Sequence, residues 1–172
     1  MLNEIFINEK KDIVRDAVDL IERFFDIRGS IIVDFEIQDS RREIFLNLTQ
    51  FSLSLNPKYL LKEEKMNLYK IMFKNLRIIY QAMEIELYRY KKLFKYYDYE
   101  KINLWKYEHD KYLSSLDIDY DFLVDSEAFS ILMVHYFFNY DFKVYKSVLK
   151  NRINELKGKF HIEWTQNSII LI

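Results

Sequence analysis

The stretch IMFKNLRIIYQ, residues 71–81, lies in the longest helical pattern of the chain and decides the fold assignment. Between about Lys62 and Phe94, apolar residues recur at spacings of three and four, which is the period of a helix. One apolar stripe consists of Tyr69, Met72, Phe73, Leu76, Tyr80, Met83 and Leu87. A second stripe consists of Ile71, Ile78, Ala82 and Ile85. Because the two stripes face different directions, the pattern predicts a helix that is covered on more than one side.

One helix and a small sheet are predicted before this central helix. Asn8 can cap a helix that Gly29 is placed to end, with an apolar face made of Ile13, Val14, Ala17, Leu20, Ile21, Phe24 and Phe25. In IIVDFEI, residues 31–37, apolar and acidic residues alternate as they do in a strand. In residues 43–56 the alternation changes phase, from Ile44, Leu46 and Leu48 to Phe51, Leu53 and Leu55. Since a one-residue slip exchanges the two faces of a strand, we expect a bulge or tight turn between Asn47 and Gln50 and antiparallel pairing.

The rest of the chain is predicted to be helical. Pro57, the only proline, closes the strand region and can begin a helical turn. After the central helix, further helices are predicted over residues 99–113, 121–140 and 142–157, and a strand or a docked tail over residues 161–172. The sequence therefore predicts a single α+β domain over residues 1–172, rich in helix and with a small antiparallel sheet.

The composition excludes several classes of protein. Half of the residues are hydrophobic and 17% are aromatic, which is the opposite of a disordered chain. The 26 basic and 27 acidic residues nearly cancel, which disfavours a globally cationic nucleic-acid binder. Disulfides and thiolate chemistry are excluded because the chain has no cysteine. Charged residues interrupt the N-terminal run MLNEIFINEKKDIV, and no apolar run approaches the length of a membrane span. We therefore expect a cytoplasmic protein without a signal peptide or a membrane partner.

The residues that most often carry catalysis are scarce. None of the three histidines, His109, His135 and His161, lies four residues from another, which is the spacing that places two imidazoles around one zinc ion. His135 falls on a mostly apolar helix face, where a hydrogen-bonded core histidine is expected. With two glycines in total and no Gly-x-Ser-x-Gly motif, phosphate-cradling loops and a serine nucleophile elbow are excluded. We expect no metal ion and no cofactor.

A basic and aromatic segment, YRYKKLFKYYDYEK, covers residues 88–101. Its first basic residues are Arg89, Lys91, Lys92 and Lys95. Cations beside aromatic rings can bind single-stranded nucleic acid. The alternative is a solvated helix end, where cations are favoured by the helix dipole, and one such segment in a net-acidic chain favours this alternative.

An acidic segment, DIDYDFLVDSE, covers residues 117–127. Its carboxylates are Asp117, Asp119, Asp121, Asp125 and Glu127. One interpretation is capping of a helix start, which accounts for Asp119 and Asp121. The other is an acidic patch that docks on a basic partner surface, for instance one that normally binds nucleic acid. The spacing and glycine of an EF-hand calcium loop are missing.

These elements together resemble a family of minimal zinc metallopeptidases encoded by phages and integrative elements of Gram-positive bacteria. Their active-site helix reads F-H-E-L-R-H-x-Y-Q, and FKNLRIIYQ, residues 73–81, is similar to it. The segments SLNPKYL (54–60) and VDSEAFSILMVHYF (124–137) resemble the turn that enters this helix and the helix that supplies the third ligand. The resemblance covers about residues 45–140 and implies a zincin-like fold: a helix, a small sheet, the active-site helix and a later helix that carries the last ligand. The abundance of Ile, Lys, Asn, Tyr and Phe is also typical of an AT-rich genome, such as that of a low-GC bacterium or its phage.

The catalytic positions of this resemblance are changed. Lys74 and Ile78 occupy the positions of the two zinc-binding histidines, Asn75 that of the general-base glutamate, and Asp125 that of the third ligand. Lysine repels zinc, asparagine is no base at neutral pH, and isoleucine has no lone pair. The resemblance thus implies a pseudoenzyme, and the same residues taken without it describe an ordinary core helix.

Three functions follow as expectations. The first is a non-catalytic protein-binding module, an inhibitor of a host or defence factor as in anti-CRISPR proteins, with a nucleic-acid-binding protein as its partner. The second is a metal-dependent hydrolase with a rearranged site. The third is a single-stranded nucleic-acid binder that uses residues 88–101, although direct nucleic-acid binding is not expected from the charge balance.

Overall fold

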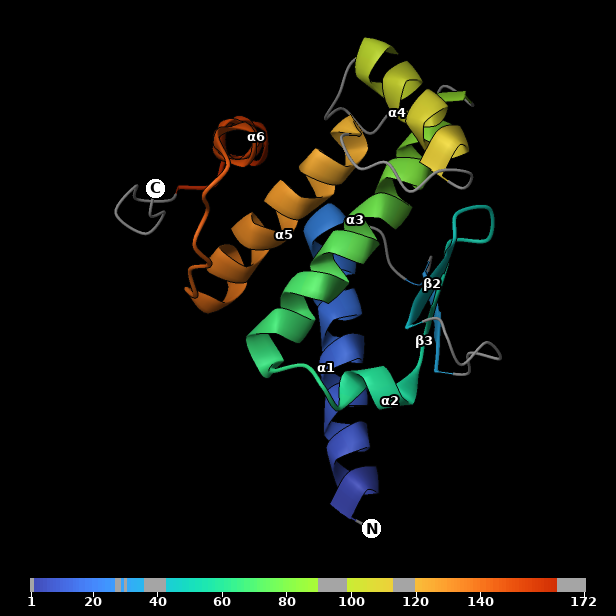
Figure 1. Ribbon diagram of the computed structural model, residues 1–172. Coiled ribbons are helices and arrows are strands. Elements are labelled where there is room, and N and C mark those ends of the chain that lie inside the picture. The colour runs from blue at the N-terminus through green and yellow to red at the C-terminus, as the bar shows by residue number, and fades with distance from the viewer. Residues whose placement is uncertain are drawn as a thin grey trace. The chain divides into compact units, whose positions relative to one another are not determined.

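The computed structural model describes residues 2–26, 29, 31–35, 43–89, 99–112 and 120–163 (Figure 1). The described elements are α1 (Leu2–Phe25), β1 (Ile32–Asp34), β2 (Ile44–Asn47), β3 (Ser52–Leu55), α2 (Pro57–Leu60), α3 (Lys65–Arg89), α4 (Tyr99–Tyr112), α5 (Asp121–Phe138) and α6 (Ser147–Phe160). The described chain is thus rich in helix and has a small three-stranded sheet, as predicted for the α+β class. No helix in these ranges combines the length and the apolar composition that a membrane span needs.

The chain divides into two compact units, which we call unit 1 (Met1–Ile79) and unit 2 (Tyr80–Ile172). The division falls within α3, which continues through it as one helix. The interpretation of residues 1–172 as a single domain stays a prediction.

In unit 1, α1 begins at Leu2, so the predicted cap at Asn8 is wrong and Asn8 lies inside the helix. The helix extends because no glycine or proline interrupts residues 2–8, and because Glu4 lies in the first turn, where a negative charge is favourable. Four residues of the predicted apolar face are buried, namely Val14, Ala17, Ile21 and Phe25. The chain leaves the helix through Asp26, whose φ is 56°.

The strands confirm the predicted turn and correct the predicted pairing. β2 and β3 form an antiparallel hairpin, in which the Asn47 side chain accepts hydrogen bonds from Thr49 N (3.1 Å) and Gln50 N (3.0 Å). β1, however, pairs in parallel with β3, so the strand order is β1-β3-β2 and the sheet is mixed rather than antiparallel. β2 pairs with one edge of β3, and β1 pairs with the other edge. Alternation alone predicts which residues share a face, but it does not predict strand direction.

The two faces of this sheet differ in solvent exposure. Leu53 and Leu55 of the central strand β3 are fully buried, whereas Ile32 of β1 is 60% exposed and Phe45 of β2 is 39% exposed. Ile32 is opposite Ser52 and Phe45 is opposite Ser54, which places both on the polar side of β3. The parity predicted for residues 31–35 and 51–55 therefore holds in the described strands.

Asn56 and Pro57 connect the sheet to α3. The Asn56 side chain accepts a hydrogen bond from Lys58 N (3.0 Å), and Pro57 is at the first position of α2, where its missing N–H costs nothing. α3 begins at Lys65, three residues after the predicted start. Residues of both predicted stripes are buried, Tyr69 to Tyr80 on the first and Ile78, Ala82 and Ile85 on the second. The prediction that this helix is covered on more than one side is thus confirmed.

In unit 2, α5 buries most of its residues between Phe122 and Val134, and α6 packs beside it. α5 ends at Phe138, and its C-cap Asn139 adopts the left-handed conformation (φ 51°) and donates a backbone hydrogen bond to His135 O (2.8 Å). The prediction that the last helix starts at residue 142 is wrong, because residues 141–146 are not helical and α6 starts at Ser147 after its N-cap Lys146. The connection between the two is held by Val144, which is 1% exposed. The predicted tail beyond residue 163 lies outside the described residues.

Candidate functional site

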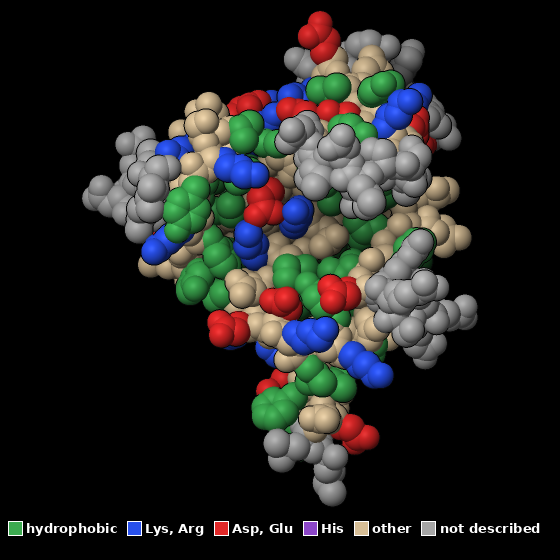
Figure 2. All heavy atoms as spheres, viewed as in Figure 1, with side chains coloured by type: hydrophobic (Ala, Val, Ile, Leu, Met, Phe, Trp, Pro, Cys, Tyr) green, Lys and Arg blue, Asp and Glu red, His purple; other side chains and the backbone are tan. Residues whose placement is uncertain are grey.

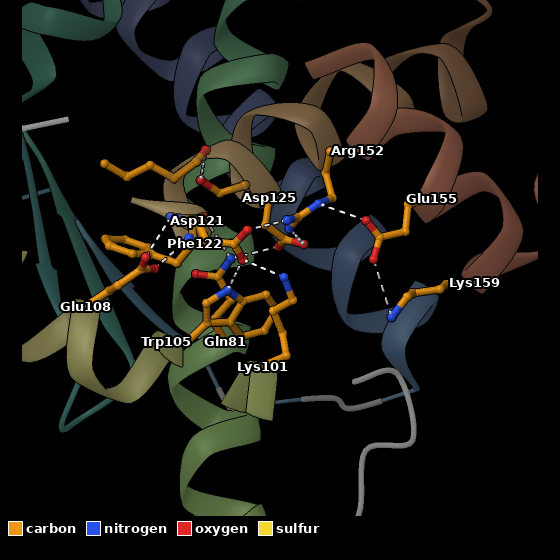
Figure 3. Close-up of polar contacts among 12 residues, drawn as sticks. Gln81, Lys101, Trp105, Glu108, Asp121, Phe122, Asp125, Arg152, Glu155 and Lys159 are labelled. Atoms are coloured by element: carbon orange, nitrogen blue, oxygen red, sulfur yellow. Dashed lines mark hydrogen bonds and ion pairs between the residues drawn. The ribbon is translucent and has the colours of Figure 1, made fainter. Parts of the chain in front are cut away.

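A buried polar network joins helices in unit 2, and we take it as the candidate functional site (Figure 3). Its side chains come from the unit 2 part of α3 and from α4, α5 and α6. We define the polar network as Gln81, Lys101, Trp105, Glu108, His109, Asp121, Asp125 and Arg152. Of these, Gln81, Trp105 and Asp125 are almost completely buried.

Asp125 is at the centre of the network and is fully buried. Its Oδ2 accepts a hydrogen bond from Gln81 Nε2 (2.8 Å), and its Oδ1 accepts one from Arg152 Nη1 (3.3 Å). Gln81 Nε2 also donates to Phe122 O (3.0 Å). An ionised carboxylate in the protein interior needs such partners, because losing its hydration costs several kcal/mol. Both oxygens of Asp125 are therefore engaged within the protein.

Asp121 lies at the first turn of α5 and receives donors from two other helices. Its Oδ2 accepts from Lys101 Nζ (3.0 Å) and Trp105 Nε1 (2.9 Å), and its Oδ1 accepts from Arg152 Nη2. Burial by itself would raise the pKa of Asp121, but hydrogen bonds from Arg152, Trp105 and Lys101 and the positive charge of Arg152 lower this pKa on balance. Asp121 therefore stays charged and binds α4 and α6 to the start of α5.

Glu108 of α4 caps α5 from outside that helix. Its Oε1 accepts a hydrogen bond from Asp121 N (2.8 Å), and its Oε2 accepts one from Phe122 N (2.9 Å). These amides have no partner within the helix, and a negative charge next to them is favourable. The sequence interpretation gave this capping role to Asp119 and Asp121, but Asp121 is inside the helix and the N-cap residue is Tyr120, which makes no side-chain capping bond. Asp119 lies outside the described residues.

His109 is buried beside this cap. Its ring meets the Phe122 ring edge to face (centroids 4.5 Å apart), and its Nε2 lies 3.4 Å from Gln81 Oε1. Burial lowers the pKa of His109 from 6.5 to about 4, while the nearby Asp110 acts in the opposite direction. The imidazole is therefore neutral at pH 7 in the folded chain.

The buried neutral histidine predicts a loss of stability in weak acid. Above pH 6.5 neither state binds the proton, whereas between pH 6.5 and about 4 the unfolded chain binds it and the folded chain does not. The free energy of unfolding should thus fall by about 1.4 kcal/mol per pH unit in this range from His109 alone. Urea unfolding of His109→Gln across this range should show a shallower fall than the unchanged chain. His161→Asn, which removes an exposed histidine at the end of α6, is the matched control for the loss of a histidine side chain. Equal slopes for His109→Gln and the unchanged chain would contradict this role.

The other histidines have separate positions. His135 is partly buried, with 13% of its side chain exposed, and its Nδ1 lies 2.6 Å from Asp141 Oδ1. It is therefore hydrogen-bonded, as predicted, but at the end of α5 rather than in the core. His161 ends α6 in a left-handed conformation. Within the described ranges, no group of three or more His, Asp or Glu side chains is arranged to hold a metal ion.

The four residues at the zinc-ligand and general-base positions of the zincin resemblance are divided between the two units. Lys74 and Asn75 are partly buried and Ile78 is 3% exposed, all in unit 1, whereas Asp125 belongs to unit 2. The Asn75 side chain donates a hydrogen bond to Ile71 O (2.8 Å), one turn earlier in α3. Asp125 is bonded to Gln81, which follows Ile78 by one turn of the same helix.

The two charged segments are described only in part. Of the acidic segment, Asp121 and Asp125 belong to the polar network and Glu127 is partly buried, while Asp117 and Asp119 lie outside the described residues. Since Asp125 is fully buried, it offers no surface to a partner in this structure. Of the basic segment, Arg89 is the last residue of α3, and Lys91, Lys92 and Lys95 lie outside the described residues.

Sequence reasoning missed most of the network, although two patterns carry a signal for it. Lys101, Trp105 and Glu108 are spaced by four and three, which places them on one face of α4. Arg152 takes a place in the apolar pattern of α6, next to Ile153 and one turn before Leu156, and all three are buried. A charged residue on an apolar helix face indicates a buried ion pair, since such residues are rarely buried alone.

Comparisons with protein-family models, with curated proteins and with solved structures find no match to the chain.

Proposed function

We propose that the chain is a non-catalytic protein-binding module on a zincin-like scaffold that has lost its metal site. The order of elements supports such a scaffold. α1, the three strands, α3 and α5 follow one another as the family resemblance implies: a helix, a small sheet, the active-site helix and the helix of the third ligand.

The proposal that the chain is non-catalytic is supported mainly by the residues at the four positions that the resemblance assigns to zinc ligands and the general base. Ile78 is a buried apolar residue, and Asn75 uses its amide for a hydrogen bond within its own helix. Asp125, which alone has a side chain suited to zinc, is held by Gln81 and by the positive charge of Arg152. A zincin needs two neutral imidazoles and a free general base. These residues supply none of the three.

Exposed apolar side chains support the proposal that the chain binds another protein. In unit 1 these include Ile5, Phe6, Ile32 and Phe45, and in unit 2 they include Tyr107, Tyr136, Tyr140, Tyr145 and Val148. Tyrosine and other large side chains supply much of the binding energy at protein interfaces. When they gather on a surface, they indicate an interaction site.

As the biological role we propose inhibition of a host or defence factor by a protein of a phage or mobile element, as in anti-CRISPR proteins. The resemblance to proteins of such elements supports this role. A nucleic-acid-binding defence protein would be the target. In a strain with an active CRISPR system, expression of the chain should raise the transformation efficiency of a targeted plasmid and leave that of an untargeted plasmid unchanged. Equal efficiencies with and without the chain would remove this role.

The binding function itself is tested with a purified partner. The immobilised chain should capture a protein from an extract of its native host, and that protein, once purified, should bind the chain with a saturable heat of titration. Peptidase activity should be absent on an unfolded protein substrate with and without added zinc. If no purified protein binds, or if zinc-dependent cleavage is found, the proposed function is wrong.

A further inference from the structure

Apolar and basic side chains are exposed from the last turn of α5, through the connection, to the first turn of α6. Tyr136 is 51% exposed, Tyr140 46%, Tyr145 54% and Val148 51%. Lys143 and Lys146, which lie between them in the sequence, are exposed as well. We call these six residues the Tyr–Lys surface. In Figure 2, hydrophobic and basic side chains lie next to one another over this connection, at the left of the view.

The backbone beneath this surface is fixed at several points. Val144 is buried between the exposed Lys143 and Tyr145, and the left-handed Asn139 sets the direction in which the chain leaves α5. The Tyr140 ring meets the Phe142 ring edge to face, with centroids 5.1 Å apart. A backbone that is already held in place loses little conformational freedom when a partner binds, so less of the binding free energy is spent on ordering it.

The positive charge of the Tyr–Lys surface favours an acidic partner. Residues 136–150 contain the lysines Lys143, Lys146 and Lys150 and one acidic residue, Asp141, which lies 2.6 Å from the His135 ring and is engaged there. The region is therefore locally basic in a chain whose net charge is −1. A basic rim around exposed aromatic side chains complements an apolar segment with acidic flanks.

We propose that the Tyr–Lys surface is the docking site for a protein segment in which apolar side chains are flanked by aspartate and glutamate. This inference rests on the proposed protein-binding function and names its surface and the chemistry of its partner. The apolar side chains would pack on Tyr140, Tyr145 and Val148, and the carboxylates would meet Lys143 and Lys146. The absence of arginine among the six residues favours a protein over single-stranded nucleic acid, which stacks bases on aromatic rings and often uses arginine.

The test uses the full chain and two fluorescent probes in an anisotropy titration. The first probe is a short soluble peptide in which phenylalanine and leucine are flanked by glutamate and aspartate, and the second is an oligo-dT single strand. We expect the chain to bind the peptide, and added salt to weaken this binding through screening. Tyr145→Ala and Lys143→Glu should each weaken it by about tenfold or more, as for central interface residues. Circular dichroism should show that both variants, which change exposed side chains, keep their helix content.

Tyr107→Ala is the matched control. Tyr107 is 62% exposed on α4 and has the ammonium group of Lys111 5.7 Å from its ring, so it is also an exposed tyrosine next to a lysine, but outside the Tyr–Lys surface. This variant should bind the peptide like the unchanged chain. The inference is overturned if the peptide does not bind, if Tyr145→Ala binds as tightly as Tyr107→Ala, or if the oligo-dT binds and the peptide does not. If a purified partner binds the chain and Tyr145→Ala leaves its affinity unchanged, the inference fails while the proposed function stands.

Discussion

Replacing Arg152 with methionine is expected to lower the free energy of unfolding by about 3–5 kcal/mol, the usual cost of removing one partner from a buried ion pair. Arg152 bonds Asp121 and Asp125 at once, and Asp125 is fully buried. Without the guanidinium, Asp125 keeps the hydrogen bond from the Gln81 amide (2.8 Å) and loses the positive charge of Arg152. Burial of the Asp125 carboxylate without this compensating charge then favours opening of this part of unit 2.

Urea unfolding at pH 7 measures this change, and two variants serve as controls. Glu155→Gln alters the exposed partner of the same guanidinium, 3.2 Å from Arg152 Nε, and should cost less than about 1 kcal/mol, as surface ion pairs do. Asp125→Asn combined with Arg152→Met removes both charges of the buried pair. This double variant should lose less than the sum of the two single variants, because no uncompensated charge remains at Asp125. A loss below about 1 kcal/mol for Arg152→Met would show that the network is not needed for stability.

Leu53→Ala is expected to be the most destabilising alanine substitution in the sheet of unit 1, with a loss of about 3–5 kcal/mol. Leu53 is fully buried in the central strand and is paired with Val33 on one side and Leu46 on the other. Its removal would leave a cavity that two flanking strands cannot easily close. The neighbouring edge residue Ile32 is 60% exposed, so Ile32→Ala should change stability by less than about 0.5 kcal/mol.

The comparison of these two variants tests the faces of the mixed sheet. Thermal and urea unfolding should place Leu53→Ala far below Ile32→Ala, which in turn should match the unchanged chain. Similar losses for both variants would mean that β1 and β3 do not have the register in which Ile32 is opposite Ser52.

Most helices and strands could be located from the sequence because the patterns that indicate them are local. Helical spacing in residues 65–89 and alternation on either side of Asn47–Gln50 depend on neighbours along the chain, and both patterns recur in the structure. The parallel pairing of β1 with β3 depends on which edge a distant strand reaches, and alternation carries no information about that. The start of α1 was misplaced because Asn8 resembles a cap without acting as one. The start of α6 was misplaced because residues 141–146 are not helical although apolar residues recur among them.

The hydrogen-bond partners within the polar network could not be predicted from the sequence, because they lie on different helices. Asp121 and Asp125 were recognised as members of an acidic segment, but their partners Lys101, Trp105 and Arg152 come from other helices. Whether a carboxylate is an exposed docking residue or a buried ion-pair partner depends on these distant donors. Glu108 shows the same limit, since it caps a helix that begins thirteen residues later and no local motif connects the two.

We propose that α3 holds no catalytic metal, because Lys74, Asn75 and Ile78 occupy the positions that the resemblance to zinc metallopeptidases assigns to two zinc ligands and a general base. The most direct measurement is the zinc content of the chain produced in zinc-supplemented medium, together with its thermal unfolding midpoint with and without a chelator. We expect far less than one zinc ion per chain and the same midpoint in both conditions. One zinc ion per chain, with a midpoint that falls when the chelator removes it, would contradict the claim.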